Sequence, residues 1–467
     1  MSVRWQPVGD LQVCVLALMT MLGVWVGSRV WQVGIALAVL WMLTRRARVP
    51  IRRDLAVVTL VLVVAGGVSS ARAWAAAHPR ALGPFQGWAT VMSDPVPFGA
   101  GLRVVLEIEG ERFDATVYGS ARRRLEPRQA GERVEIVGER RAATGPWARR
   151  SQVRHVVGEV TIDRVGAWSD GTPMSLASNR LRRTLRDSAE RSMPADRSAL
   201  FTGLVIGDDT RQPPRMIDEF RASGLSHLTA VSGQNVAFVL AVVGIGLRSL
   251  SRWWRLGATC AVIAWFVVLT RVEPSVLRAG TMAAFSAVGF ALGRERTATR
   301  TLGLAVIVLV LFDPLLVWSV GFWLSVGATF GVSAIAPRIE PLLRGPHWLV
   351  APLSVTLGAQ IGVLAPSWLV FGRMPPLGIV ANLLAVPVAG FVMLYGIPAG
   401  LVGALPVGVL GEIVMWPASV GTRWVATVAG LTARLQPTGR GAVAVWLVQL
   451  GLLAVLLRPD RAREGAR

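Results

Sequence analysis

Apolar runs recur from one end of this sequence to the other, and many approach the length of about 20 residues that crosses a bilayer as a helix. Hydrophobic residues make up 53% of the 467 positions, and charged residues make up 16%. Soluble domains carry about 25% charged residues. The sequence therefore predicts a polytopic α-helical membrane protein, with about 12 crossings because several of the runs are short.

One region, residues 80–170, has a different pattern. Its segments alternate apolar and polar residues, and turn signals such as Glu109-Gly110 and Ala130-Gly131 separate them. This period is that of half-buried strands. About five such strands in about 80 residues favour a small closed or nearly closed β-barrel, which we interpret as OB-like.

Arginine-rich loops give a consistent membrane topology. They comprise residues 44–53, 248–255, 293–300 and 337–347 and the tail 458–467. Placing all of them in the cytoplasm satisfies the positive-inside rule with alternating crossings. Both termini of this multi-pass chain are then expected to be cytoplasmic, and the β-barrel insert is expected to be extracytoplasmic.

These patterns predict five regions along the chain. They are N-terminal transmembrane helices at 1–79, the extracytoplasmic OB-like domain at 80–170, amphipathic or interfacial helices at 171–222, a polytopic domain at 223–457 and a basic cytoplasmic tail at 458–467.

The absence of lysine excludes several chemistries. The formal net charge is +21, and all 49 basic residues are arginine. A Walker A loop and a Schiff base both require lysine, so any ATP-driven step must come from another protein. The two cysteines lie in apolar runs and the four histidines are scattered, so we expect no disulfide, metal site or cofactor.

Five segments, taken in order, resemble the ComEC/Rec2 competence proteins, the family that forms the membrane channel for DNA uptake in natural transformation. They are "GLVIGDD" at 203–209, "FRASGLSHLTAVSGQNVAF" at 220–238, "PSVLRAGTMA" at 274–283, "FDPLLVWSVGFWLSVGAT" at 312–329 and "GAQIGVLAPSWLVFGRMPPLGIVANLLAVPVAG" at 358–390. Each is weak alone, but together they are specific, and the likeness extends to about residue 405.

The resemblance implies a channel that passes single-stranded DNA through the bacterial cytoplasmic membrane and is not itself an enzyme. It also implies a DNA receptor protein outside, an ATP-driven motor and the lipid bilayer as partners; the oligomeric state stays open. Many members of the family continue into a metallo-β-lactamase-like domain. Because the chain ends at Arg467 and has no H-x-H-x-D-H motif, we expect no nuclease activity here and consider a separate nuclease as a further partner.

Polar side chains inside the matching segments are the candidates for the DNA path. Such groups are costly in a bilayer and normally face protein, water or a ligand. The candidates are His227, Ser232, Gln234, Asn235, Arg278, Gln360 and Asn382. The alternatives are interhelical hydrogen bonds for the uncharged groups and a snorkelling position at the interface for Arg278.

Arginines of the β-barrel are the candidates for a DNA-receiving surface, since a polyanion binds clustered positive charge. They are Arg122, Arg123, Arg124, Arg140 and Arg141. An ordinary solvated surface is the alternative. For the whole chain, two other functions remain open: a secondary transporter of a small anionic solute, and a membrane-embedded hydrolase that uses Ser232 and His227 without a carboxylate nearby.

Overall fold

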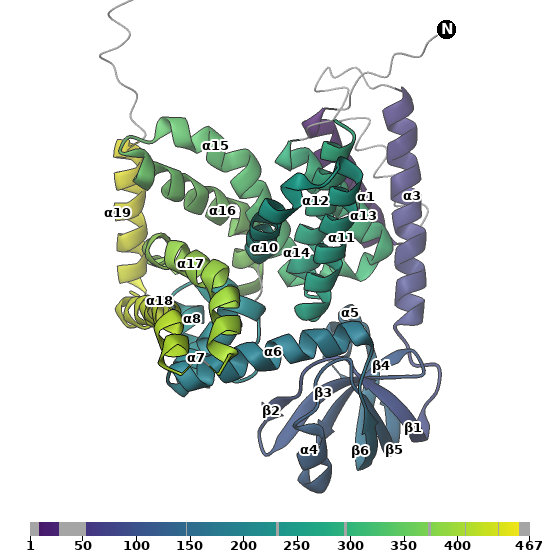
Figure 1. Ribbon diagram of the computed structural model, residues 1–467. Coiled ribbons are helices and arrows are strands. Elements are labelled where there is room, and N and C mark those ends of the chain that lie inside the picture. Colours follow the sequence, from purple (N-terminus) through teal and green to yellow (C-terminus); the bar gives the residue numbers. More distant parts are fainter. Residues whose placement is uncertain are drawn as a thin grey trace, which may run out of the picture. The chain divides into compact units, whose positions relative to one another are not determined.

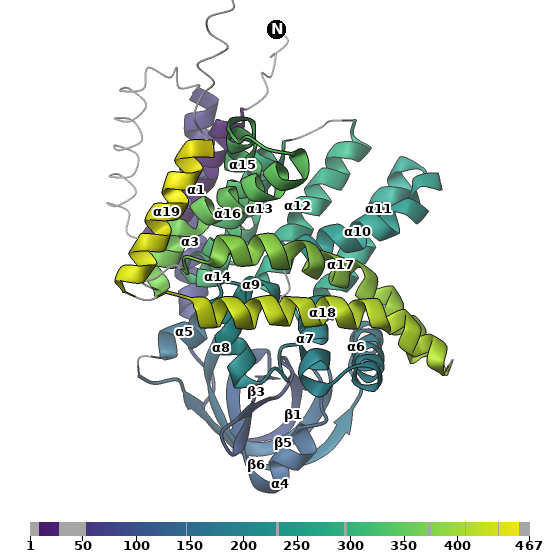
Figure 2. The ribbon, with the colours of Figure 1, turned by 90° about the vertical axis from the view of Figure 1, so that its left-hand side faces the viewer.

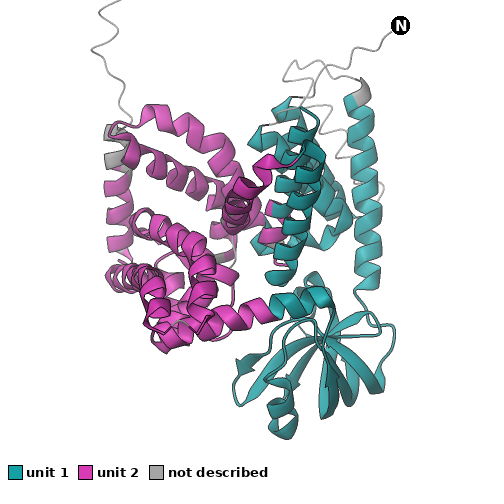
Figure 3. Cartoon of the chain, in the orientation of Figure 1, with its two compact units in different colours: residues 1–179, 251–271, 280–322 teal, residues 180–250, 272–279, 323–467 magenta. Residues whose placement is uncertain are grey.

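The computed structural model describes residues 9–27, 53–145, 147–229, 233–293, 297–371, 375–406, 408–437 and 439–456. The chain divides into two compact units, which Figure 3 shows in different colours. The first unit comprises residues 1–179, 251–271 and 280–322, and the second comprises 180–250, 272–279 and 323–467. Residues 44–52 of the expected loop at 44–53, and the tail at 458–467, lie outside the described residues.

Six strands and two short helices of the first unit occupy the region where alternation predicted a small sheet. The strands are β1 Gly83–Val91, β2 Val96–Phe98, β3 Gly101–Ile108, β4 Glu111–Val117, β5 Arg133–Ala142 and β6 Val156–Ser169. The helices are α4, Gly119–Leu125, and α5, Ala148–Val153.

Five of these strands close into a ring. The sheet runs in the order β1-β5-β6-β4-β3-β2, and β1 also pairs with β3. The β4–β6 pair is parallel, whereas the other pairs are antiparallel. Figure 1 shows these strands wrapped around one another, with β2 at the edge. The ring leaves β2 as an edge strand that pairs with β3.

The interior of the ring follows directly from the alternation in the sequence. Along β4, Phe113, Ala115 and Val117 are buried, while the residues between them are partly exposed. These three side chains belong to a continuous apolar core with contributions from all five strands of the ring and from α4. The barrel therefore has a hydrophobic core of its own.

The other described elements of the first unit are helices. They are α1 Asp10–Val26, α3 Arg53–Ala76, α11 Arg252–Leu269, most of α12 Pro274–Ala291, α13 Ala298–Phe312 and a 3-10 helix at Pro314–Trp318. Helix α1 packs against α3 and α13. At the start of α13, Arg300 Nε donates to Asp10 Oδ1 at 3.0 Å, which links α13 to the start of α1.

The second unit contains most of the C-terminal helices. The end of α6 Pro173–Ser192 leads into α7 Ala195–Ile206, α8 Pro214–Ala222, α9 Ser226–Thr229, α10 Gly233–Gly246 and a 3-10 turn at Leu247–Ser249. Then follow α14 Val320–Phe330, α15 Ala336–Ile339 with a 3-10 turn at Glu340–Leu342, α16 His347–Phe371, α17 Gly378–Ala404, α18 Val409–Leu435 and α19 Arg440–Leu456. Helices α17 and α18 run side by side in Figure 2 and pack against each other.

Within the described residues, five helical stretches are long and apolar enough to cross a membrane. They are Leu55–Ala76, Arg252–Leu269, Val320–Leu342, His347–Val370 and Gly378–Ala404. Four shorter apolar helices accompany them, at Asp10–Val26, Asn235–Ser249, Ser275–Ala291 and Ala298–Phe312. The chain is thus mostly helical with a small sheet, as a membrane protein with an insert requires, and the count of about 12 crossings stays a prediction.

Four glycines let two of these stretches approach at backbone distance within the second unit. A Cβ atom on Gly331 would lie 2.0 Å from the carbonyl oxygen of Gly358, and a Cβ on Gly327 would lie 2.4 Å from that of Gly362. On each of the two helices the glycines are four residues apart, which is the spacing of close helix packing in membranes. Side chains at these positions would force the helices apart.

The helix that carries Gly331 contains a π-helical turn at Gly331–Ile335. Pro337 follows this turn, and a proline ring clashes with the carbonyl four residues earlier in a regular α-helix. The wider turn accommodates the proline without breaking the helix, which is the usual cause of such local irregularities.

Candidate functional site: a buried arginine among the polar residues

Arg278 is buried one turn inside α12, with 5% of its surface exposed. Its Nε donates to Ser325 Oγ at 2.8 Å, and its Nη1 donates to Thr329 Oγ1. Thr329 Oγ1 in turn donates to the carbonyl oxygen of Ser325 at 3.0 Å. The guanidinium is therefore held by hydroxyls of α14 inside the second unit, and it does not snorkel to an exposed position.

The guanidinium also lies at the point where α10 begins. A Cβ atom on Gly233 would lie 3.1 Å from Arg278 Nη2 and 2.9 Å from the Cβ of Ala279. A glycine at this position therefore leaves the room that the arginine occupies. The guanidinium and the N-terminus of α10 therefore share one location. Because the start of a helix carries positive partial charge, both are positive there.

Asn235 ties the same helix to α7. Its side chain is buried, with 3% exposed, and Nδ2 donates to the carbonyl oxygen of Leu204 at 3.1 Å. Leu204 belongs to the segment 203–209 and Asn235 to the segment 220–238, so two of the quoted motifs meet here. This contact is the interhelical hydrogen bond that was the alternative for Asn235.

Gln360 and Asn382 each lie near Gly378, where α17 begins. Asn382 Nδ2 donates to the Gly378 carbonyl oxygen at 2.7 Å. Gln360 Nε2 lies 3.5 Å from where a Cβ on Gly378 would be, and a Cβ on Gly224 would lie 3.6 Å from Gly378 Cα. Gly224 thus lies beside Gly378 at the start of α17, and Gly233 lies beside Arg278.

The other three predicted path residues are less well placed. His227 lies on α9, and its side chain is on the surface of the second unit. Gln234 is the second residue of α10. Ser232 lies outside the described residues.

The barrel arginines differ in their partners. Arg140 is buried, and its Nη1 donates to Glu109 Oε2 at 2.7 Å. Arg124 Nη1 donates to the Val165 carbonyl oxygen and Arg122 Nη1 to that of Ala100, each at 2.8 Å. Arg141 Nη2 donates to Glu139 Oε2 at 2.7 Å. Arg123 is exposed, and its side chain has no hydrogen bond or ion pair with a described residue.

Comparison with known proteins decides the family. The model of the "Competence protein" family matches residues 204–461, which is more than half of the chain and includes every path candidate. The chain belongs to the competence protein family. The resemblance inferred from the five segments is therefore confirmed.

Three curated relatives of this competence protein match it over only part of their length. It is 28% identical over 276 residues to "Competence protein ComA" of Neisseria gonorrhoeae, covering 56% of the chain and 38% of the relative. It is 29% identical over 218 residues to "ComE operon protein 3" of Bacillus subtilis (strain 168), covering 45% and 27%. It is 27% identical over 242 residues to "Uncharacterized protein YcaI" of Escherichia coli (strain K12), covering 47% and 31%. No solved structure is significantly similar to the chain.

Sequence reasoning missed the hydroxyls that hold Arg278 in this competence protein. Ser325 and Thr329 are four residues apart in the segment 312–329, so they share one face of a helix. Two small hydroxyl side chains on one face of an apolar helix were the available signal.

A second missed feature is a buried charge cluster around Asp208, in the segment 203–209. Asp208 and Arg182 each have about 2% of their surface exposed. Asp208 pairs with Arg182 at 3.6 Å and with Arg186, and it accepts a hydrogen bond from Thr210 Oγ1 at 2.6 Å. Burial would raise the pKa of the Asp208 carboxyl, but the two arginines and Thr210 outweigh it and lower the pKa to about 2. The cluster holds α6 against the end of α7.

We predict that Asp208→Asn destabilises the protein by about 2 kcal/mol, because a lowered carboxyl pKa is a stability contribution. That contribution should be complete above about pH 4 and should be lost as the pH falls towards 2. Thermal unfolding in detergent across this range measures it. Asp209→Asn, at the exposed neighbouring position, is the matched control; equal stability of the two variants would contradict the prediction.

A further cluster lies in the first unit, where Arg271 follows α11. Its Nη2 and Nε donate to the two carboxylate oxygens of Asp94 at 2.7 and 3.1 Å, and its Nη1 donates to the Ala130 carbonyl oxygen at 3.2 Å. Arg271 and Val272 both have φ of 60°, which is unusual for residues other than glycine. The bidentate ion pair with Asp94 fixes this strained backbone after α11 against the barrel.

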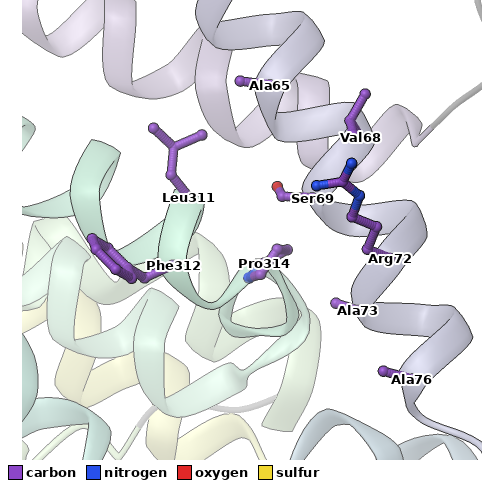
Figure 4. A pocket seen from close by; sticks show the side chains of 9 residues that line it. All are labelled: Ala65, Val68, Ser69, Arg72, Ala73, Ala76, Leu311, Phe312 and Pro314. Carbon is purple, nitrogen blue, oxygen red and sulfur yellow. The ribbon is translucent and has the colours of Figure 1, made fainter.

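The first unit also contains an apolar cleft of about 540 Å³, shown in Figure 4. Its walls are one face of α3 and the end of α13, with Arg72 as the charged residue among them. None of the predicted path or surface residues lines this cleft. Groups of three or more metal-ligating side chains are absent from the described residues.

Proposed function

We propose that this competence protein is a channel component that passes single-stranded DNA across the cytoplasmic membrane during natural transformation, and that it is not an enzyme. Membership of the family supports a role in DNA uptake, and one of the relatives is named "Competence protein ComA". Because the chain spans between 27% and 38% of the curated relatives' length, the activity and the substrate are proposals for this chain.

The observation that carries the proposal is the buried Arg278 guanidinium at the start of α10. A cation and a helix N-terminus at one position both attract an anion, and the loss of water strengthens that attraction. Ser325 and Thr329 hold the guanidinium in place. A phosphate passing this position would be bound by a fixed positive site, and a path must bind weakly enough to release the strand again.

Six other residues complete the proposed path: His227, Ser232, Gln234, Asn235, Gln360 and Asn382. Asn235, Gln360 and Asn382 are supported by their contacts with the Leu204 carbonyl and with Gly378. His227, Ser232 and Gln234 are proposed from the sequence alone. Irregular backbone at membrane depth is tolerated where it lines a cavity or lies within protein.

We propose that the barrel is of the OB type and receives DNA outside the membrane. The support is the order of its strands, with one parallel pair, and the position of α4 in the chain between β4 and β5, the third and fourth ring strands in sequence. Among the five candidate arginines, Arg123 is the one most available for a phosphate, while Arg140 serves the barrel through Glu109.

The proposed topology places both termini in the cytoplasm and the barrel outside, with the five regions of the sequence as domains. In a variant with Cys14 and Cys260 replaced by alanine, we expect Ser120→Cys on α4 to react with an impermeant maleimide in cells stripped of their wall. Ser249→Cys, in an arginine-rich loop, should react only after lysis. The opposite pattern would overturn this topology.

The test of the function is deletion of the gene in its host, with surface-bound and nuclease-protected DNA measured separately. We expect protected DNA to be lost while surface-bound DNA stays, because a receptor outside holds the DNA and a separate motor draws it in. Protected DNA at the wild-type level would contradict the proposal.

A second candidate is a secondary transporter of a small anion, which the Arg278 site would also suit. It predicts that deletion of the gene abolishes uptake of a labelled small anion and leaves DNA uptake unchanged. The same strain therefore separates the two functions.

A further inference from the structure

Among the aromatic side chains exposed on the barrel, Phe98 and Tyr118 lie on either side of one turn. Phe98 at the end of β2 has 55% of its surface exposed, and Tyr118, immediately before α4, has 59% exposed. Exposed apolar groups that gather at one place on a soluble surface usually mark an interaction site.

Both rings flank the turn that joins β2 to β3. Phe98 is the cross-strand partner of Gly101. A Cβ on Gly101 would lie 2.7, 3.0 and 3.1 Å from Cε1, Cδ1 and Cζ of Tyr118, so the Tyr118 ring lies flat on this glycine. The opposite face of the ring is thereby presented outward, and any side chain at position 101 would displace it.

Positive charge surrounds the two rings. The Arg103 guanidinium lies 5.9 Å from the centre of the Phe98 ring, and Arg122 Nη1 donates to the Ala100 carbonyl oxygen in the turn at 2.8 Å. Asp114 and Glu126 offset the charges of Arg103 and Arg122. Arg123, next along α4, pairs with none of the described residues and leaves the surface with excess positive charge.

We propose that Phe98 and Tyr118 stack on two bases of single-stranded DNA, while Arg122 and Arg123 contact the adjoining phosphates. This inference rests on the proposed function and assigns the aromatic part of its receiving surface. Unpaired bases expose both faces and stack on aromatic rings, whereas the bases of a duplex are already stacked. A ring that lies flat on the backbone with one free face has the geometry for stacking.

The test uses the full chain in nanodiscs of phosphatidylcholine and fluorescence anisotropy with two probes. One is an oligothymidylate of about 20 nucleotides, and the other is a strand of equal length made of abasic sites. We expect the wild type to bind the oligothymidylate at least about tenfold more tightly, because each stacked base contributes substantially. Tyr118→Ala and Phe98→Ala should each weaken oligothymidylate binding about tenfold and leave binding of the abasic strand unchanged.

Two variants serve as controls, and a third separates charge from stacking. Tyr118→Phe keeps the ring and should bind within twofold of the wild type. Trp147→Ala removes another exposed aromatic residue of the barrel, 65% exposed, and should have no effect. Arg123→Gln should reduce the slope of log affinity against log salt by about 0.7 while preserving the preference for bases.

The outcomes separate this inference from the proposed function. Equal binding of the two probes by the wild type, with steep salt dependence, overturns the stacking and leaves a phosphate-receiving surface. Unchanged oligothymidylate binding in both alanine variants also overturns it and favours the bilayer surface as the partner of these rings. If the wild type binds neither probe, the receiving surface itself is refuted, and the stacking with it.

Discussion

Arg278→Ala is expected to reduce nuclease-protected DNA at least about 100-fold while surface-bound DNA stays at the wild-type level. The reason is that the guanidinium is the buried positive charge at the start of α10, where desolvation strengthens any contact with a phosphate. A loss of two tenfold steps corresponds to about 3 kcal/mol, the size of a charge-assisted contact. Uptake measured at matched membrane levels of the protein tests this.

Conservative variants distinguish a contact with DNA from a structural role. Arg278→Lys keeps the charge and loses the planar fork of donors, so we expect partial uptake. Ser325→Ala removes the hydroxyl that holds Nε and should reduce uptake less than Arg278→Ala. Arg252→Ala, an exposed arginine at the start of α11, should leave uptake unchanged. Wild-type uptake by Arg278→Ala would remove this residue from the path.

Gly331→Val is expected to destabilise the protein by about 3 kcal/mol or more and to lower its amount in the membrane. Its Cβ would overlap the carbonyl oxygen of Gly358, 2.0 Å away, and neither backbone can yield without separating the helices. Thermal unfolding in detergent and the membrane level of the protein are the measurements.

Gly257→Ala on α11 is the matched control, because nothing lies within 4 Å of its added Cβ. Replacing an unconstrained helical glycine with alanine should be neutral or stabilising by about 0.5–1 kcal/mol. If Gly331→Val is as stable as Gly257→Ala, the close contact between the two stretches does not exist in the membrane.

The sequence predicted the barrel core and the family because both leave a local signal. Period-two alternation specifies which side of a strand is buried, so Phe113, Ala115 and Val117 could be assigned inward without knowing the strand order. The order of the five matching segments likewise required no knowledge of their contacts. Both features are determined by residues that are close together in the sequence.

The contacts of the candidate site could not be predicted, because they join residues distant in sequence. Arg278 and Ser325 are 47 positions apart, and no local pattern specifies which hydroxyl a buried arginine selects. Asn235 has the same limitation, since its partner is a backbone carbonyl on α7. Backbone groups carry no sequence signature, so a buried polar side chain indicates a need for a partner without naming it.

The passage of a strand through the purified protein is the central claim, and a planar bilayer tests it most directly. Single-stranded DNA is added on the side of the barrel, a voltage draws it across, and the far chamber is assayed by amplification. We predict that single strands appear there only when the protein is present, that blunt duplexes do not, and that Arg278→Ala abolishes their passage. No strand in the far chamber with the wild type, or equal passage of blunt duplexes, would contradict the account.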